Sequence, residues 1–232
     1  MNKKDLFFAL LVIVAFSPFF WSNPVYEFYT SYNLEHGMVM AFVKFAILAT
    51  LGEVIGLRIK TGNYIQKGFG IIPRAIVWGF IGLTIKMAFI IFATGTPNFL
   101  AYLGLENASS AMLGGLSWYK LLVAFCISAA MNIIYAPVMM TFHKITDTHI
   151  VDNGGTIQGF FTPIRFKSIF MKLDWKVQWN FVFKKTIPLF WIPAHTITFL
   201  LPPEFRVLFA ALLGIMLGVF LAVAAQLGKN KT

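Results

Sequence analysis

The stretch 75–93 reads AIVWGFIGLTIKMAFIIFA, and its one charged side chain is Lys86. About 20 consecutive apolar residues are enough for a helix to cross the hydrocarbon core of a bilayer. This stretch therefore predicts a transmembrane helix, and it sets the fold class to be tested along the rest of the chain.

The composition agrees with a membrane location. Of the 232 residues, 58% are hydrophobic, 17% are aromatic and 12% are charged, whereas a soluble domain has about 25% charged residues. A chain of this size could not hide so much apolar surface from water. We therefore predict an all-α integral membrane protein and exclude the soluble classes. The single cysteine, Cys126, excludes an intrachain disulfide.

Six apolar stretches, separated by polar or Pro/Gly-rich breaks, predict a single domain built as a compact bundle of about six transmembrane helices. The predicted spans are 6–21, 38–57, 75–93, 121–141, 187–201 and 207–227. The first resembles a signal peptide because Lys3 and Lys4 precede it. No small-x-small cleavage site follows, so we expect this span to be retained.

The basic residues predict the orientation. With the N-terminus inside, 15 of the 19 Lys and Arg residues fall on the cytoplasmic side, Lys120 and Arg206 fall outside, and Lys44 and Lys86 lie within spans. This asymmetry follows the positive-inside rule and places both termini in the cytoplasm. The net charge of +10 is therefore explained as a topology signal, and no nucleic-acid partner is expected.

The segment 141–185 contains the longest part outside the spans. Its first part, 147–162, is predicted as a loop because it contains Asn153-Gly154-Gly155. Apolar residues then recur at helical spacing over 164–185, which predicts an amphipathic helix lying in the cytoplasmic interface against anionic lipid. The expected lipid-facing residues are Arg165, Lys172, Trp175, Lys176 and Trp179. The alternative is a soluble helix that caps the bundle.

Polar residues within spans are the candidate functional residues, because a charge at the bilayer centre costs at least about 2.5–3.5 kcal/mol. Lys86 lies near the midplane, whereas Lys44 and Glu53 can reach an interface along their stems. Asn132 and His195 have comparable depth. We expect Lys86, Asn132, Glu53 and His195 to line a hydrated pocket. The alternative is a packed polar cluster in which Lys86 bends toward Glu53.

Other motifs bear on packing and chemistry. Gly52-x-x-x-Gly56 and Gly214-x-x-x-Gly218 predict close helix packing, within one chain rather than between copies, although a homo-oligomer stays open. Kinks are expected at Pro137, Pro188 and Pro193. No phosphate loop, metal-ligand spacing or nucleophile–base pair is visible. We therefore predict no enzymatic activity, no catalytic residues, no metal and no cofactor.

The C-terminal half carries a family resemblance. WIPAHTITF at 191–199, followed by Pro202-x-x-x-Arg206, resembles the pattern Trp-Pro-x-x-Gln-x-x-Asn-Phe then Val-Pro-x-x-x-Arg of the Mpv-seventeen / peroxisomal membrane protein (twenty-two kilodalton) family. Asn132 stands where that family has Gln five residues before a Pro, and Lys86 stands where it has His. Gly52-Glu53 is similar to its Gly-Asp. The resemblance covers about 42–227 and marks a distant member.

The resemblance implies a helical bundle with channel-like activity for small solutes in an organelle or similar membrane. Met131 in place of Asp and Lys86 in place of His would make its pocket more positive, so we expect an anion preference. The alternative is a non-transporting scaffold that binds lipid or a cytosolic partner. The base count of 15 Lys to 4 Arg and the lack of a presequence favour a bacterial inner membrane, with an organelle membrane as the alternative.

Overall fold

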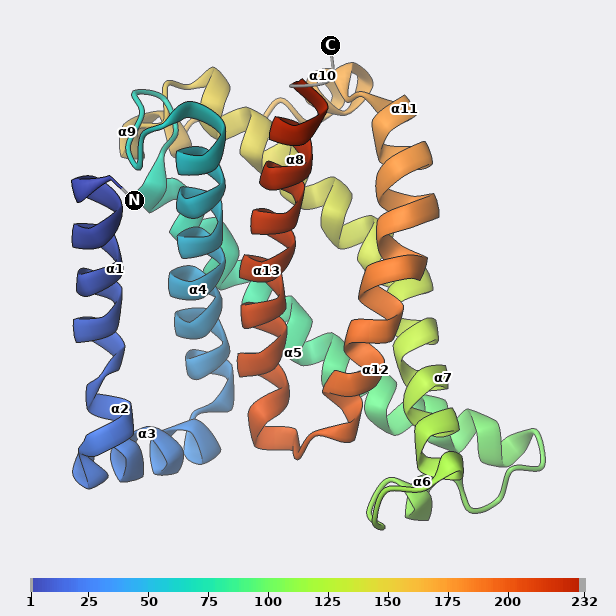
Figure 1. Cartoon of the computed structure of the whole chain (residues 1–232). Helices are drawn as coiled ribbons and strands as arrows, with labels where there is room; N and C mark the ends of the chain where they lie inside the picture. The colour runs from blue at the N-terminus through green and yellow to red at the C-terminus, as the bar shows by residue number, and fades with distance from the viewer. Residues whose placement is uncertain (1, 230–232) are drawn as a thin grey trace. The chain divides into compact units, whose positions relative to one another are not determined.

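The computed structural model describes the backbone of residues 2–229 and the side chains of residues 2–219 (Figure 1). Every regular element among the described residues is a helix, which confirms the predicted all-α class. The chain divides into two compact units, Met1–Met40 and Ala41–Thr232, where the sequence predicts one domain.

Three helices make up most of the first unit, α1 (Lys3–Phe16), α2 (Pro18–Trp21) and α3 (Asn23–Glu35). α1 begins at a capping box, in which the Asn2 side chain accepts from the Lys4 N–H and the Asp5 carboxylate accepts from the Asn2 N–H. Pro18 starts a new helix directly after Ser17, so the stretch predicted as one span over 6–21 is divided. The 14 residues of α1 rise about 21 Å.

Among the described residues, two helices are long and apolar enough to cross a membrane, α4 (Gly37–Thr61) and α5 (Ile71–Tyr102). A bent helix pair, described next, gives a third candidate if it counts as one span. The protein is therefore membrane-embedded. Both predicted helices are present and both are longer than expected. α5 has 32 residues, which rise about 48 Å, so its ends extend past a hydrocarbon core of about 30 Å.

The predicted span 121–141 is formed by two helices, α7 (Trp118–Ile134) and α8 (Ala136–Asp152), which are bent by 44°. The bend lies at Tyr135, and Pro137 occupies the first turn of α8, where its missing N–H costs no hydrogen bond. The kink is thus found where it was predicted. The loop predicted from Asp147 begins only after Asp152, because α8 continues until the Asn153 side chain caps it by donating to the His149 carbonyl.

The prediction of a single amphipathic helix over 164–185 is wrong. After the short α9 (Ile157–Phe160), the chain forms α10 (Phe166–Lys172), then α11 (Trp175–Val177), which runs directly into η1 (Gln178–Trp191). The break lies at Leu173, whose backbone leaves the helical conformation and whose side chain is buried. Asp174 then starts a new helix by accepting from the Val177 N–H.

The predicted span 187–201 combines the end of η1 with α12 (Ile192–Leu200), and α13 (Pro203–Lys229) covers the last predicted span. η1 is π-helical, a form normally restricted to single turns. Its wider turn is visible where the Thr186 hydroxyl donates to the Phe181 carbonyl five residues earlier. Pro188 lies inside η1 and Pro193 lies in the first turn of α12.

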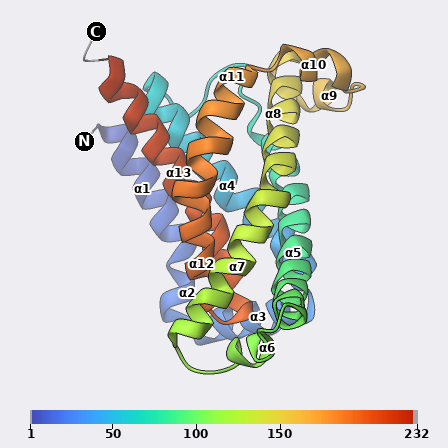
Figure 2. The same cartoon turned by 90° about the vertical axis from the view of Figure 1, so that its right-hand side faces the viewer.

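The loops of the second unit gather at two ends (Figures 1 and 2). One end, called here the basic end, carries the α4–α5 link, α9, α10 and α11; the opposite end carries α6 (Ala108–Ala111) and the α12–α13 turn. Basic residues concentrate at the first, while Lys120 and Arg206 lie toward the second. Those at the basic end are Arg58, Lys60, Lys67, Arg74, Arg165, Lys167, Lys172 and Lys176.

The glycine motifs pack two helices of the same chain together. A Cβ added to Gly52 of α4 would lie 2.8 Å from the Cα of Ile215 on α13, and one added to Gly218 would lie 3.4 Å from the Gly52 carbonyl oxygen. Only a residue without a side chain allows this approach at Gly52. The prediction of close packing within one chain is confirmed.

Candidate functional site

Glu53 on α4 is the centre of a charged cluster near the basic end. Its Oε2 accepts from Arg74 Nη1 at 2.6 Å, and its Oε1 accepts from Trp78 Nε1 at 2.9 Å. Arg74 and Trp78 are four residues apart on α5, so they share one helix face. Two groups of α5 therefore hold both oxygens of one carboxylate of α4.

Helix α8 completes the cluster with a second pair four residues apart. His143 Nε2 lies 3.2 Å from Glu53 Oε1, and Asp147 Oδ1 forms an ion pair with the Arg74 guanidinium. Lys144 Nζ lies 3.4 Å from the other oxygen of Asp147. We call Glu53, Arg74, Trp78, His143 and Asp147 the charged cluster; it joins α4, α5 and α8.

The guanidinium of Arg74 is held in a fixed orientation. Arg74 is 7% exposed, its Nε donates to the Phe69 carbonyl at 2.7 Å, and its Cζ lies 4.3 Å from the centre of the Phe69 ring. Its planar fork can bind two carboxylates in different directions. Arg74 is thus the group through which Glu53 and Asp147 are both compensated.

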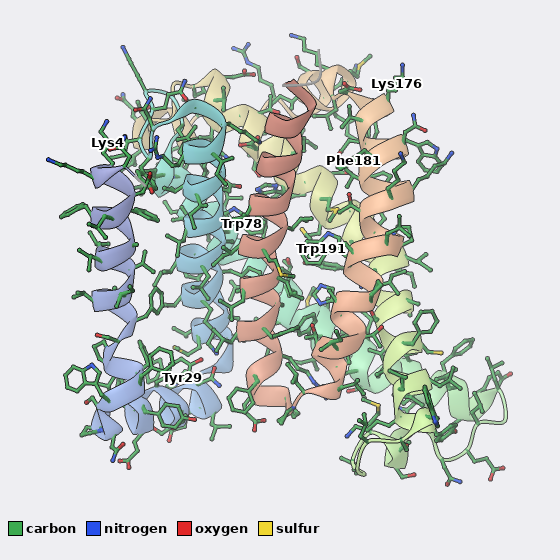
Figure 3. The ribbon with its side chains drawn as sticks, viewed as in Figure 1. Lys4, Tyr29, Trp78, Lys176, Phe181 and Trp191 are labelled. Atoms are coloured by element: carbon green, nitrogen blue, oxygen red, sulfur yellow. The ribbon has the colours of Figure 1, made fainter. Side chains whose placement is uncertain are left out.

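Aromatic rings cover the same cluster inside the bundle. The Trp78 ring centroid lies 4.4 Å from that of His143 and 6.4 Å from that of Phe45, with which it is stacked. Trp78 is labelled in Figure 3, where it lies among the side chains between the helices. The rings exclude water from one side of the cluster, which strengthens its ion pairs.

The structure changes the expected partner of Glu53. Among the described residues, no hydrogen bond or ion pair joins Lys86 to Glu53; Arg74 and His143 bind it instead. Neither Arg74 nor His143 is among the candidate residues expected from the sequence. The signal that could have found them is the spacing of four residues between Arg74 and Trp78 and between His143 and Asp147. This spacing places each pair on one helix face, but only if α5 and α8 extend over these positions.

Asn132 belongs to a different contact, which ties α7 to α12. It is 1% exposed, and its Nδ2 donates to the Ser128 carbonyl at 2.9 Å and to the Ser128 hydroxyl at 3.3 Å. The Ser128 hydroxyl donates to the Ile192 carbonyl at 2.7 Å. These bonds satisfy an acceptor at the start of α12, where the π-helix ends.

His195 lies on α12 in an aromatic setting. Its Nδ1 is 3.2 Å from the Thr198 hydroxyl, its ring stacks on Trp191 with centroids 5.2 Å apart, and Phe89 of α5 meets it edge-on at 5.6 Å. His195 is buried. It lies beside α5 but has no contact with the charged cluster among the described residues.

Lys86 is half-buried at the middle of α5, as the sixteenth of its 32 residues. Lys44, the other lysine within a predicted span, is a buried residue of α4. The four predicted pocket residues are therefore placed in separate surroundings: Glu53 in the charged cluster, Asn132 and His195 at the packing of α7 and α12, and Lys86 between them along α5.

Two further features lie elsewhere. An open hollow of about 440 Å³ is found at the opposite end and includes Asn107, Ser110 and Tyr119, with none of the predicted pocket residues in its wall. Within the described residues, no group of three or more His, Cys, Asp or Glu side chains is arranged to hold a metal ion.

Comparisons of the chain with protein-family models, with curated proteins and with solved structures found no match. The resemblance to the Mpv-seventeen family therefore stays a prediction.

Proposed function

We propose that the protein forms a narrow pathway for small, preferentially anionic, solutes, and that the charged cluster closes its cytoplasmic end. The observation that carries this proposal is the pairing of the buried Arg74 with two partly buried carboxylates, Glu53 and Asp147, on three different helices. Helices joined by ion pairs can separate when water enters, because hydration then replaces the lost partners. A cluster of this kind favours a dry, closed arrangement over a wet, open one.

The proposal includes six spans with both termini in the cytoplasm. The positive-inside distribution supports this topology, and the basic end would then face the cytoplasm. The charged cluster lies near that end, since Arg74 is in the first turn of α5 and Glu53 is in the last third of α4. A bacterial inner membrane is the proposed location, with an organelle membrane as the alternative.

The proposed anion preference rests on two lysines in the membrane-spanning helices. Lys86 is half-buried at the middle of α5, and Lys44 is buried in α4. Two positive charges within a low-dielectric region attract anions and repel cations. The resemblance to the Mpv-seventeen family adds the expectation of channel-like activity. We propose no enzymatic role.

Reconstitution tests the function directly. The natural chain, Asp147→Asn and a control, Lys120→Gln at the opposite end, are placed in planar bilayers between unequal KCl solutions. We expect a reversal potential near that of chloride and a several-fold larger mean conductance for Asp147→Asn, because Arg74 loses one of its two carboxylates. Absence of conductance in all three proteins, or a reversal potential near that of potassium, would overturn the proposal.

A non-transporting scaffold is the second candidate. It is favoured by the hydrogen bonds of Asn132, Ser128 and Thr198, all of which are made within the bundle. Under this alternative the intramembrane polar groups hold helices together, and the aromatic and basic residues at the basic end bind lipid or a partner.

A further inference from the structure

A surface that combines exposed aromatic and basic side chains covers the broken segment at the basic end. We propose that this surface binds the headgroups of anionic phospholipids. It is called here the basic aromatic surface and is defined by Phe170, Lys172, Trp175, Lys176, Trp179 and Lys184. The proposal goes beyond the solute pathway and holds equally for a transporter or a scaffold.

The apolar side chains of this surface are exposed in the structure. Trp179 is 56% exposed, Phe170 45% and Trp175 36%, and Met171 beside them reaches 71%. Contiguous apolar patches of this kind mark a surface that another body covers. Figures 1 and 3 place the segment at the end of the bundle, with Lys176 at its outer edge and Phe181 further along η1.

Buried apolar contacts attach the basic aromatic surface to the helical bundle. Ile169 of α10 and Leu173 pack in a buried cluster with Ile145 of α8. The inward-facing residues of α10 are thus buried against α8, so α10 packs on the bundle. The neighbouring side chains face outward, so the break at Leu173 presents them without a further ordering cost.

The aromatic rings are also fixed in place. Trp175 Nε1 donates to the Phe170 carbonyl at 3.0 Å, and the two rings meet edge-on with centroids 4.7 Å apart. Lys184 Nζ lies 5.6 Å from the centre of the Trp179 ring. Tryptophan with adjacent lysine is the combination typical of the headgroup region, where one part of each side chain is apolar and another is wet.

The charge of the segment selects an anionic occupant. Residues 164–185 carry six basic side chains and one acidic, Asp174, which gives 6 − 1 = +5. The Asp174 carboxylate is occupied by the Val177 N–H. Anionic lipids attract such a surface, with a contribution from each lysine near the membrane plane. A soluble acidic protein would satisfy the charge but offers no acyl-chain region to cover the exposed aromatic rings.

Energy transfer from tryptophan to labelled lipid tests the proposal. The full chain is reconstituted in phosphatidylcholine vesicles containing a trace of pyrene-labelled phosphatidylglycerol or, separately, pyrene-labelled phosphatidylcholine. The test variant is K172Q/K176Q/K184Q. The control, K4Q/K60Q/K67Q, removes the same charge from the same predicted membrane side. Circular dichroism and elution volume confirm that all three proteins are folded.

We expect about threefold more transfer to labelled phosphatidylglycerol than to labelled phosphatidylcholine for the natural chain and the control, and equal transfer for the test variant. An equal loss of preference in both variants would show a diffuse charge effect and overturn the proposal. Equal transfer to both labelled lipids by the natural chain would also overturn the proposal. If added polyglutamate then binds, the occupant of the surface is an acidic protein. Conductance measured on the same samples tests the proposed solute pathway independently of lipid binding.

Discussion

Glu53 Oε2 on α4 and Arg74 Nη1 on α5 lie 2.6 Å apart, and this pair is the centre of the charged cluster. The two residues are 21 positions apart in the chain and are joined by the antiparallel packing of consecutive helices. The same guanidinium also binds Asp147 on α8. One arginine therefore connects three helices, and the predictions about stability and gating start from it.

Replacing Arg74 by Met should strongly destabilise the protein, because it leaves two partly buried carboxylates without their cation. Removing one partner of a buried pair costs about 3–5 kcal/mol. Unfolding in detergent, followed by circular dichroism, should show a large fall in Tm for Arg74→Met and almost none for the exposed Lys60→Gln. The triple variant E53Q/R74M/D147N should recover part of the loss. Equal Tm values for Arg74→Met and the natural chain would contradict the network.

Gly52→Ala should separate α4 from α13. Its new methyl group would lie 2.8 Å from the Cα of Ile215, and overpacking of this kind costs about 1–3 kcal/mol. Gly214→Ala is the matched control, since nothing lies within 4 Å of its added Cβ and alanine favours a helix by about 1 kcal/mol over glycine. We expect the two substitutions to change Tm in opposite directions. A shift of the same sign in both would count against the close packing.

Ser128→Ala should loosen the connection between α7 and α12. The substitution removes the donor to the Ile192 carbonyl and an acceptor of Asn132, and an unsatisfied buried group costs about 1–3 kcal/mol. Hydrogen exchange should accelerate at the start of α12, where that carbonyl lies. Ser168→Ala, on the exposed face of α10, provides the comparison and should leave the exchange unchanged.

Lys86→Met tests the solute pathway with little change in side-chain length. If Lys86 attracts anions, we expect chloride conductance to fall about tenfold or more while circular dichroism and Tm are retained. Lys86→Arg should preserve most of the conductance because it keeps the charge. Unchanged conductance with a lowered Tm would assign Lys86 a packing role instead.

Cysteine labelling tests the orientation of the bundle. In a Cys126→Ala background, Lys67→Cys in the α4–α5 link and Gly114→Cys near α6 report the two ends. A membrane-impermeant maleimide applied to intact cells should label the second and reach the first only after lysis. The reverse pattern would invert the topology, and equal labelling of both positions in intact cells would show that they do not lie on opposite sides.

The helical class and the membrane location follow from the sequence because they depend on hydrophobicity counted along the chain. The kink before Pro137 and the close packing at Gly52 were predictable for the same reason, since the lack of an N–H or of a side chain acts locally. The 164–185 helix was not. Its periodicity is real, but the helix ends at Leu173, whose side chain packs in a buried cluster with Ile145 of α8, and that partner is distant in the sequence.

By itself, the sequence determined that this is an all-α membrane protein and which end of each helix carries the basic residues. The tertiary structure decided the partners of the polar side chains. Glu53 is bound by Arg74, Trp78 and His143 rather than Lys86, because the lengths of α5 and α8 place those groups beside it. A charge in a low-dielectric interior is stabilised only by groups within a few ångströms, and such distances are set by helix packing, which composition and spacing along the chain do not fix.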